Sequence, residues 1–337
     1  MYNFEVIENH NPKWREIITK ADAYDFHHTA YFHKIDTDFP KLLLCFYNEL
    51  DFIALPVLKR PIQGTSFFDL TSVYGYAGPI FHFSSLENKQ KLIDFFKESF
   101  KNYCKENKIV SVFARLHPLI NQSEILRGLG DIVELNKTIC IDLTVPAEEQ
   151  RKQYRKSLKS ELNQLRRKGI IIKEAESKEE IDQFIEIYYE TMERVQASSS
   201  YYFSKKYFYE FLHNSDFKAN LLIAVNNGLV IAGAIFTFTK KIMQYHLAGT
   251  TEKFISEAPM KLILDEARLL GNQSNVECLH LGGGVGGSDD DSLFKFKSAF
   301  SKKFHQFAVW KYVFNEEIYN NLSIGKESSQ FFPLYRS

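Results

Sequence analysis

The sequence predicts two tandem α/β domains, each with a mixed and mostly antiparallel sheet flanked by helices. The chain has 337 residues, which is about twice the usual length of one domain. Apolar residues make up 45% of it, with 30 Phe and 18 Tyr, enough for two packed cores. A weak internal repeat points the same way, because both halves show the same order of strands and helix. We place the boundary after a strand at Lys137–Leu143, which gives domains at 1–145 and 146–337.

Each half opens its repeat with a hairpin. Residues 42–58 and 221–236 both read as an apolar strand, a short turn and a second apolar strand. Asn227-Gly228 is typical of a type I′ turn, in which both central residues take positive φ. The first half has Asn48 at this place, which makes a poorer version of the same turn.

A β-α-β crossover follows each hairpin, as a parallel strand pair requires. The expected strand, helix and strand are Ser66–Val73, Ser84–Lys105 and Ile109–Leu116 in the first half, and Lys241–Ala248, Glu257–Leu270 and Val276–Leu281 in the second. The shared order favours a duplicated domain over a chance likeness between two generic α/β units.

A basic helix is expected at about 148–168, at the start of the second domain, and Gly169 would end it. Its apolar stripe has helical spacing and consists of Tyr154, Leu158, Leu162 and Leu165. Arg155, Lys159 and Arg166 fall along the other side. These cations either hold the phosphates of a ligand or form a solvated helix face.

Charge and cysteine content exclude several classes of protein. The 42 Lys and Arg balance the 42 Asp and Glu, so no global basic field indicates bulk nucleic-acid binding. The four cysteines form no C-x-x-C pair and no zinc-type cluster with histidine, so we expect four reduced, buried thiols. We recognise neither a signal peptide nor a run of the ~20 apolar residues that a membrane span needs. We therefore expect a cytoplasmic protein and leave open a peripheral contact with the inner membrane.

The segment 279–301, LHLGGGVGGSDDDSLFKFKSAFS, is the richest in chemistry. A strand is expected to end at Leu281, and Gly282, Gly283 and Gly284 then bring backbone N–H groups close to a ligand. The glycine spacing also matches a dinucleotide fingerprint, but three aspartates intervene before the helix and would repel a pyrophosphate. These aspartates lack the alternating spacing of a calcium loop, so we expect no metal.

A short helix should follow this loop, with Asp291 or Ser292 as its N-cap. Its apolar face consists of Leu293, Phe296 and Phe300. Lys297 lies within that face, whereas Lys295 points to the other side. A lysine there costs free energy unless its ammonium has a partner or reaches a cleft. Lys297 either snorkels to solvent or holds a cation over a reaction centre, where it stabilises a developing oxyanion.

Two further segments present side chains to a ligand. The loop YGYAGP in the first half carries Tyr74, Tyr76 and Gly78, and it is either a substrate platform or a compact turn. In the second half, Arg194 and Tyr202 lie between two expected helices and suit an anionic or sugar ligand.

His246, in a strand of the second half, is either a ligand contact or a histidine satisfied in the core. The chain shows no sequence context for a Ser-His-Asp or Cys-His constellation, which disfavours a covalent mechanism.

The motifs YGYAGP, LHLGGG and LFKFKSAF, in this order, resemble the FemAB family and its relatives in the GNAT superfamily. The segments RKQYRKSLKSELNQLRRKGI and TMER match the same pattern, so the resemblance covers nearly the whole chain. It implies two GNAT-like domains with a cleft between them. Members of the family transfer amino acids from aminoacyl-tRNA to the peptide stem of cell-wall precursors. Other relatives resemble N-acyltransferases that modify sugars of surface polysaccharides.

The resemblance also implies roles for single residues. The Phe-Lys pair of the family corresponds to Phe296 and Lys297, where the lysine stabilises the tetrahedral intermediate and the phenylalanine carbonyl orients the amine. The chain departs from the family pattern at Ser301, where glycine is usual, and it lacks the long coiled-coil arm of some members. The segment Gly249–Glu257 has no pyrophosphate-binding loop of the kind that acetyl-CoA enzymes use.

We therefore expect transfer of an acyl or aminoacyl group to an amine of a cell-envelope precursor, by direct attack in an inter-domain cleft. The acceptor would be nucleotide- or lipid-linked, the donor aminoacyl-tRNA or acyl-CoA, and no cofactor would be tightly bound. One alternative is an acyl-CoA-dependent N-acetyltransferase that acts on a sugar of a surface polysaccharide. The other is a non-catalytic binding protein on a degenerate GNAT fold. The sequence leaves the oligomeric state open.

Overall fold

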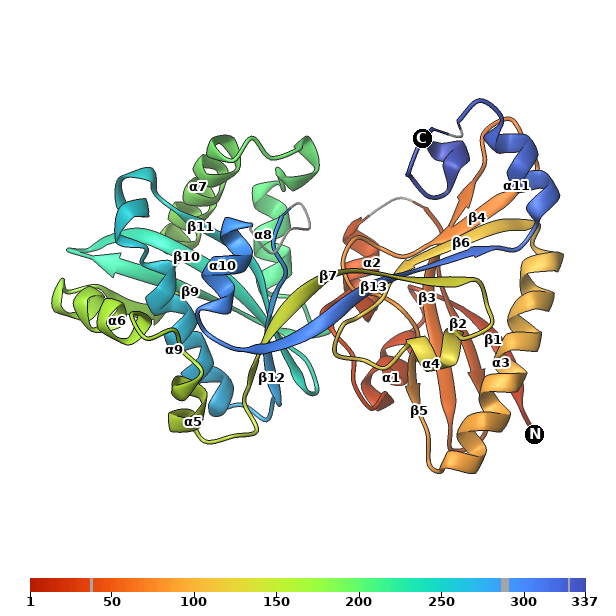
Figure 1. The fold of residues 1–337 in the computed structure, drawn as a ribbon, viewed down its shortest axis with the longest axis horizontal. Helices are drawn as coiled ribbons and strands as arrows, with labels where there is room; N and C mark the ends of the chain where they lie inside the picture. Colours follow the sequence, from red (N-terminus) through yellow and green to blue (C-terminus); the bar gives the residue numbers. More distant parts are fainter. Residues whose placement is uncertain (37–38, 286–290, 327) are drawn as a thin grey trace. The chain divides into compact units, whose positions relative to one another are not determined.

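The structure is a computed structural model that describes residues 1–36, 39–285, 291–326 and 328–337. The chain forms two compact units (Figure 1): unit 1 is Met1–Asn136 with Gln306–Ser337, and unit 2 is Lys137–His305. The C-terminal segment thus returns to unit 1. The domain division predicted at residue 145 stays a prediction.

The strands of unit 1 are β1 (Asn3–Glu8), β2 (Lys41–Tyr47), β3 (Phe52–Pro61), β4 (Phe68–Thr71), β5 (Ile80–His82), β6 (Ile109–Arg115) and most of β13 (Lys303–Val313). Its helices are α1 (Lys13–Lys20), η1 (Phe26–His28), α2 (Ala30–Asp36), α3 (Leu86–Glu106), α4 (Ser123–Leu126), α11 (Glu316–Ser323) and η4 (Leu334–Arg336). The sheet runs β1-β2-β3-β4-β6-β13, and β5 pairs with β3. β4 and β6 are parallel, and the other described pairs are antiparallel.

Helix α3 covers the core of unit 1. It begins after Ser85, whose side chain accepts a hydrogen bond from the Asn88 N–H at 3.2 Å and so satisfies one free donor of the first turn. Its buried face carries Phe96 and Phe100, which pack in one cluster with Trp310 of β13. Because Trp310 packs in this cluster, β13 is part of the core of unit 1. Burial of a large apolar side chain contributes about 1.5–3 kcal/mol.

The strands of unit 2 are the second half of β7 (Asp131–Asp142), with β8 (Ile171–Glu174), β9 (Lys218–Asn226), β10 (Leu229–Phe238), β11 (Ile242–Thr250) and β12 (Cys278–Gly282). Its helices are α5 (Ala147–Lys152), α6 (Leu158–Arg167), α7 (Lys178–Arg194), η2 (Ser199–Tyr201), α8 (Lys205–Leu212), η3 (Glu252–Glu257), α9 (Met260–Asn272) and α10 (Ser292–Ser298). The sheet runs β8-β9-β10-β11-β12-β7, and β11 and β12 form its parallel pair.

Two layers of helices cover the sheet of unit 2 (Figure 1). Helices α6, α9 and α10 share one apolar cluster with the sheet face that carries Ala232 and Ala234. Gly233 lies between them and faces the other way, where a Cβ would lie 2.5 Å from Phe184 of α7. α7 and α8 therefore pack on the opposite face.

The two units share one strand order and one pattern of directions. In each, three antiparallel strands are followed by a helix and then by a strand parallel to the third. These are β2, β3, β4, α3 and β6 in unit 1, where the short β5 precedes α3, and β9, β10, β11, α9 and β12 in unit 2. An antiparallel strand follows on the far side, β13 in unit 1 and β7 in unit 2. The predicted tandem α/β architecture and its β-α-β crossovers are confirmed.

The predicted hairpin turn is confirmed and the predicted long helix is wrong. Asn227 and Gly228 have φ of 49° and 80°, as a type I′ turn requires. The helix expected at 148–168 is broken into α5 and α6. Between them the Arg155 N–H donates to the Ala299 carbonyl at 2.8 Å, a bond to α10 that a continuous helix would not make.

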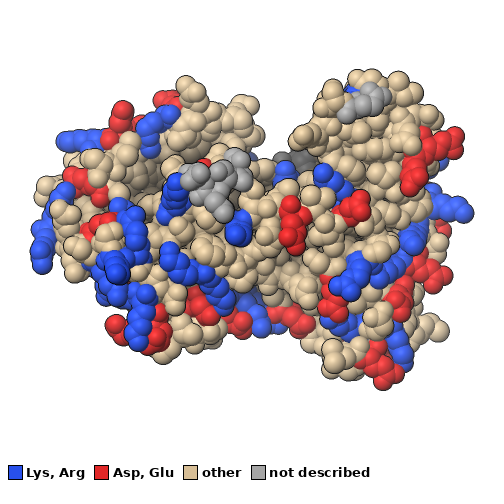
Figure 2. Space-filling view, in the orientation of Figure 1, with Lys and Arg blue, Asp and Glu red and all other residues tan. Residues whose placement is uncertain are grey.

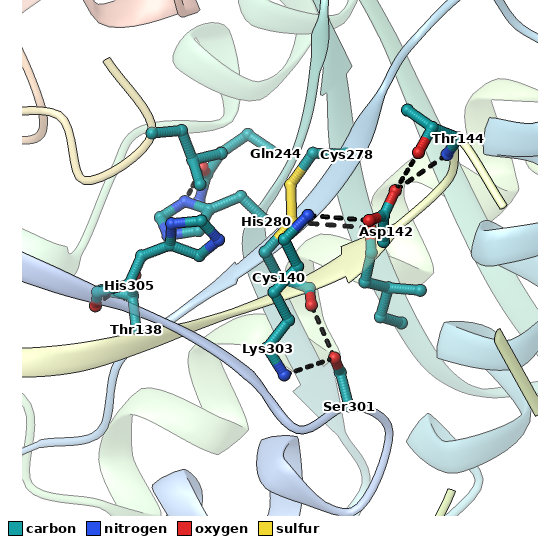
Figure 3. Close-up of a disulfide and its surroundings, with 12 residues drawn as sticks. Thr138, Cys140, Asp142, Thr144, Gln244, Cys278, His280, Ser301, Lys303 and His305 are labelled. Atoms are coloured by element: carbon teal, nitrogen blue, oxygen red, sulfur yellow. Dashed lines mark hydrogen bonds and ion pairs between the residues drawn. A yellow bond between two sulfur atoms is a disulfide. The ribbon is translucent and has the colours of Figure 1, made fainter. Parts of the chain in front are cut away.

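The expectation of four reduced thiols is also wrong. Cys140 of β7 and Cys278 of β12 form a disulfide (Figure 3), whereas Cys45 and Cys104 are free and buried. Cys140 lies opposite His280 in the strand register, so the two bonded cysteines are diagonal neighbours on one face of an antiparallel pair.

In the described part of the chain, no helix is both long enough and apolar enough to cross a bilayer.

Candidate active site

The parallel strands of unit 2 part where their pairing ends. Gln244 of β11 lies opposite His280 of β12, and this is the last pair of the parallel register. Beyond it β11 stays paired with β10 as far as Thr250, while β12 stays paired with β7 as far as Gly282. The carboxyl ends of two diverging parallel strands are where α/β sheets accept ligands.

A glycine bulge turns the end of β12. The register with β7 shifts between His280 and Gly282, and Gly282 has a φ of 72°. Glycine adopts this left-handed backbone at little cost, so the bulge re-aims the next peptide. Gly284 packs against the N-terminus of α10, because a Cβ there would lie 2.3 Å from Asp291 Oδ1.

The ammonium group of Lys297 in α10 contacts both β11 and the segment just after β12. Its Nζ donates a hydrogen bond of 2.7 Å to the Gly283 carbonyl, just after β12. The same Nζ lies 5.6 Å from the ring centroid of Tyr245 on β11, within range of a cation–π interaction. The side chain of Lys297 is buried rather than snorkelling, since the residue is 7% exposed.

Burial changes the titration of this ammonium. Loss of solvent lowers the pKa of Lys297 to about 8, and the negative charge of Asp291 acts in the opposite direction. Near pH 7 the side chain is therefore largely charged but weakly solvated, the state in which a cation acts strongly on a nearby negative charge.

Helix α10 is fixed at both ends. Asp291 is its N-cap and accepts the Phe294 N–H at 2.8 Å, as one of the two predicted caps. At the other end Ser301 Oγ donates to the Cys140 carbonyl at 2.7 Å, which ties the helix to β7 beside the disulfide (Figure 3). Ser301, the departure from the family pattern, is thus a buried hydrogen-bonding residue. Asp289 and Asp290 of the acidic run lie outside the described residues.

Sequence reasoning missed Tyr245. The alternation in Gln244-Tyr245-His246 places Tyr245 on the face that packs with α10, and its neighbours on the other. That strand pattern was a usable signal, but the meeting of β11 with α10 is a long-range contact that local periodicity does not show.

The comparisons with known proteins agree with this geometry. Residues 152–297 match a family model described as an acetyltransferase (GNAT) domain. This segment begins in α5 and ends at Lys297, so it contains the parted strands and the buried lysine. These residues form a GNAT acyltransferase domain. No curated protein sequence matches the chain.

Solved structures show the fold of this acyltransferase. A crystal structure of FemX is similar with a TM-score of 0.73 and 12% identity over 95% of this chain and 99% of that one. The structure of L-PGS from Bacillus licheniformis has a TM-score of 0.58 and 13% identity, over 91% and 93%. A conserved protein of unknown function from Bacteroides thetaiotaomicron has a TM-score of 0.59 and 11% identity, over 93% and 100%. The predicted fold with GNAT-like domains is confirmed, and the predicted resemblance to FemX and its relatives is confirmed for the fold.

The predicted Phe296 lies one residue before the buried lysine and packs against the core of unit 2. Its carbonyl accepts the Ala299 N–H at 3.3 Å, which leaves one lone pair of the oxygen for another donor. Lys295 of the same helix is exposed, as expected.

The basic side chains near α6 are partly neutralised. Figure 2 shows Lys and Arg gathered over α6 and α10. Arg155 forms an ion pair with Glu161 at 2.8 Å, and Arg166 pairs with Asp265 and Glu266. A role for Arg155 in binding a ligand stays a prediction.

The other predicted contacts of unit 2 form an aromatic cluster of α7, α8 and β11. His246 stacks on Phe211 at 4.8 Å, and its Nε2 lies 3.3 Å from the Tyr207 hydroxyl. Tyr202 is 42% exposed and stacks on Tyr189. Arg194 lies at the C-terminal end of α7, where it is exposed. The structure does not join these side chains to Lys297 by any described contact.

The predicted contacts of unit 1 lie on the loop after β4. Tyr74 is 59% exposed, Tyr76 is half-buried, and Arg115 lies 5.0 Å over the Tyr74 ring. Gly78 meets a buried side chain closely, because a Cβ there would lie 2.5 Å from Gln122 Oε1. The loop thus presents one tyrosine to solvent on a tightly packed base.

Among the described residues, no group of three or more His, Cys, Asp and Glu side chains is arranged to hold a metal ion.

Proposed function

We propose that this acyltransferase transfers an acyl or aminoacyl group to an amine of a cell-envelope precursor. The observation that carries the proposal is the buried Lys297 ammonium, held between the parted strands of a GNAT domain. FemX and L-PGS share the fold, which supports a precursor of the cell envelope as the acceptor. The predicted cleft between the domains stays a prediction.

The chemistry follows from charge. A neutral amine attacks the acyl carbonyl, and a negative oxygen develops in the tetrahedral intermediate. The Lys297 ammonium stabilises this oxyanion at low solvation, and the Phe296 carbonyl orients the attacking amine. The group passes directly to the amine, without an acyl-enzyme. The donor is an ester or thioester, that is, aminoacyl-tRNA or acyl-CoA.

One observation favours acyl-CoA as the donor in a second version of this function. The matched family model is that of an acetyltransferase domain, which suggests an N-acetyltransferase acting on an amino sugar. Thermal-shift measurements with acetyl-CoA and with aminoacyl-tRNA separate the two donors, because the ligand that binds the folded state raises the melting temperature with its concentration.

The catalytic role is tested with Lys297→Met, which removes the charge and keeps much of the buried volume. Loss of one oxyanion donor lowers kcat by about 100- to 1,000-fold, and we expect this loss on the donor and acceptor pair found in the binding screen. Wild-type turnover should also fall as the pH rises past about 8, because the ammonium loses its proton there.

Lys302→Met is the matched control. Lys302 follows α10 closely, is exposed, and donates at 3.4 Å to the Ser298 carbonyl. It should keep wild-type turnover. A Lys297→Met enzyme that turns over as fast as this control would refute the catalytic role.

A further inference from the structure

The disulfide of unit 2 lies in the two strands that also hold the buried lysine. Cys140 of β7 and Cys278 of β12 are bonded, with their Cα atoms 6.2 Å apart (Figure 3). Cys278 is the first residue of β12, and the Gly283 carbonyl that binds Lys297 Nζ comes directly after the last one. One half of the disulfide and the hydrogen-bond partner of the ammonium group therefore belong to one short strand and its first following residue.

The backbone of Lys297 is tied to the other strand. Ser301, just after α10, is 3% exposed. Its Oγ donates to the Cys140 carbonyl at 2.7 Å and accepts the Lys303 N–H at 3.0 Å (Figure 3). The Phe300 N–H donates to the Lys297 carbonyl at 3.1 Å, so a single turn connects the lysine to Ser301. The position of the helix that carries the lysine thus depends on β7 at the bonded cysteine.

Two strands therefore hold the two ends of one residue. β12 holds the ammonium of Lys297 through Gly283, and β7 holds its helix through Ser301. The antiparallel register of β7 with β12 shifts between His280 and Gly282, close to the lysine. A bulge disrupts the ladder locally. The S–S bond thus adds a covalent link to a strand pair whose own pairing is interrupted beside Lys297.

The two bonded cysteines differ in access to solvent. Cys140 is 1% exposed, whereas Cys278 is half-buried. In thiol–disulfide exchange a thiolate attacks one sulfur atom, and the rate depends on which sulfur it can reach. We therefore expect a thiol in solution to attack Cys278, with Cys140 as the leaving sulfur.

The two free cysteines are unsuited to take part in this exchange. Cys45 and Cys104 are buried and lie in unit 1. Burial raises the pKa of Cys45 to about 12 and also raises that of Cys104. Because the thiolate is the reactive form of cysteine, both stay unreactive thiols near pH 7. Redox chemistry is thus confined to the bonded pair of unit 2.

We propose that Cys140 and Cys278 form a reversible redox switch that sets the position of Lys297. In the oxidised form the S–S bond fixes β12 against β7, and the lysine is held between Gly283 and Ser301. A dithiol reduces the pair. Its first thiolate attacks Cys278 Sγ, the S–S bond breaks, and the Cys140 sulfur leaves with the electron pair and binds a proton.

The second thiol of the reagent completes the reduction. It attacks the reagent sulfur of the mixed disulfide, and Cys278 leaves and binds a proton, so two electrons and two protons have passed from the dithiol to the protein. A low-molecular-weight disulfide reverses the reaction and takes both electrons and both protons back as two thiols.

The strand register makes the exchange reversible. Cys140 lies opposite His280, two residues along β12 from Cys278, so the ladder keeps the two cysteines diagonal neighbours in the reduced form as well. Reduction therefore loosens the support of Lys297 without separating the strands. The consequence for turnover rests on the proposed function, whereas the link between the disulfide and the lysine does not.

The first test counts thiols and needs no substrate. Alkylation of the denatured protein should find two thiols before treatment with dithiothreitol and four after it, with Cys140 and Cys278 as the new ones. Oxidised glutathione, added after removal of the dithiol, should restore the count of two. Four thiols in every sample, or a pair that dithiothreitol does not reduce in the folded protein, would overturn the proposal.

The second test follows Lys297 by labelling with acetic anhydride across a pH series, after removal of the dithiol in the absence of air. Burial lowers the pKa of Lys297 to about 8, and water reaches a loosened ammonium more easily. Reduction should therefore raise this pKa toward its ordinary 10.5. Cys278→Ala should give the reduced value with and without dithiothreitol, whereas Cys45→Ala, the matched control, should respond like the wild type. An unchanged pKa on reduction would refute the switch.

The third test examines the contact that connects the disulfide to the helix. Ser301→Ala keeps both cysteines but removes the hydrogen bond from the end of α10 to the Cys140 carbonyl. Lys297 should then have the raised pKa in both redox states, so its response to dithiothreitol disappears. Ser298→Ala is the control, because Ser298 Oγ donates only within the helix, to the Lys295 carbonyl at 3.0 Å. A full response in Ser301→Ala would contradict the proposal.

Turnover separates this inference from the proposed function. On the donor and acceptor pair from the binding screen, reduction should lower kcat by up to about 100-fold, as misplacement of a reacting group by about 1 Å does, and oxidised glutathione should restore it. If Lys297→Met keeps turnover while reduction still shifts the Lys297 pKa, the proposed function fails and the switch stands. If Lys297→Met loses turnover and reduction changes neither the pKa nor kcat, the switch is overturned and the proposed function stands.

Discussion

The two units place opposite chemistry at the same point of one fold. Unit 2 buries a cation, Lys297, where β11 and β12 part. Unit 1 buries an anion, Asp25, among imidazoles where β4 and β6 end. Strand order and direction are shared, so the fold determines where polar groups gather, and the side chains determine what they do.

The two buried charges are also held differently. Lys297 has one carbonyl and one aromatic ring as described partners. Asp25 accepts hydrogen bonds from the Phe26 N–H and from His27 Nδ1, and the His117 imidazole lies 3.3 Å away. A weakly held charge suits electrostatic catalysis, whereas a fully hydrogen-bonded one also supports its surroundings. Removal of the charge should therefore lower the stability of unit 1 and leave that of unit 2 unchanged or higher.

Removal of each charge should give the largest difference between the units. Asp25→Ala leaves imidazole donors unpaired in the core, and we expect it to lower the free energy of unfolding of unit 1 by about 3–5 kcal/mol. Lys297→Met removes a poorly solvated cation and should leave unit 2 as stable or more stable. Both tryptophans, Trp14 and Trp310, lie in unit 1, so denaturant unfolding followed by tryptophan fluorescence reports on that unit.

Hydrogen exchange of the β11 and β12 amides reports on unit 2 in the same samples. If Lys297→Met destabilised unit 2 as strongly as Asp25→Ala destabilises unit 1, Lys297 would be a structural residue and the contrast between the sites would disappear.

Acid should weaken unit 1 through His28 and His33. Burial lowers the pKa of His28 to about 3 and that of His33 to about 4, from an ordinary 6.5. Below pH 6.5 the unfolded chain binds a proton on each and the folded chain does not. Their contribution is therefore fully present above pH 6.5 and falls as the pH drops, by about 1.4 kcal/mol per pH unit for each histidine.

Tryptophan fluorescence in urea at pH 7, 6 and 5 measures this slope. His28→Phe should make the dependence shallower, because one of the buried histidines that take up a proton on unfolding is then missing. A slope that is unchanged in this variant would show that His28 is already charged in the folded protein.

The fold and the helix of the candidate site follow from local patterns. Turn chemistry at Asn227-Gly228 and the helical period around Lys297 depend on neighbours in sequence, and both predictions agree with the structure. The break between α5 and α6 does not follow from local patterns, because it depends on a bond from Arg155 to a distant carbonyl. Periodicity alone continues a helix through such a point.

Contacts between distant segments account for what the sequence did not show. The bonded cysteines are 138 residues apart and become neighbours through the pairing of β7 with β12. The contact of Asp25 with His117 depends on the sheet edge of unit 1 in the same way. The return of Gln306–Ser337 to unit 1 rests on the burial of Trp310, a tertiary effect.

The smallest expected effect concerns the ring beneath Lys297. An aromatic face within about 6 Å stabilises an ammonium by about 0.5–1 kcal/mol, so we expect the Tyr245 ring to favour the charged form of Lys297, which burial disfavours. Tyr245→Leu removes the ring and should lower that pKa by about half a unit. Tyr245→Phe keeps the ring and should leave the pKa unchanged. Labelling with acetic anhydride across a pH series, with mapping of the Lys297 peptide, measures the pKa without any substrate. Equal shifts in both variants would assign the effect to the hydroxyl, and no shift in either would leave the Gly283 carbonyl as the partner that matters. The two variants thus show which contact keeps Lys297 charged, since among the described residues no carboxylate is hydrogen-bonded to it. In unit 1, by contrast, hydrogen-bond donors hold the carboxylate of Asp25 in its charged form.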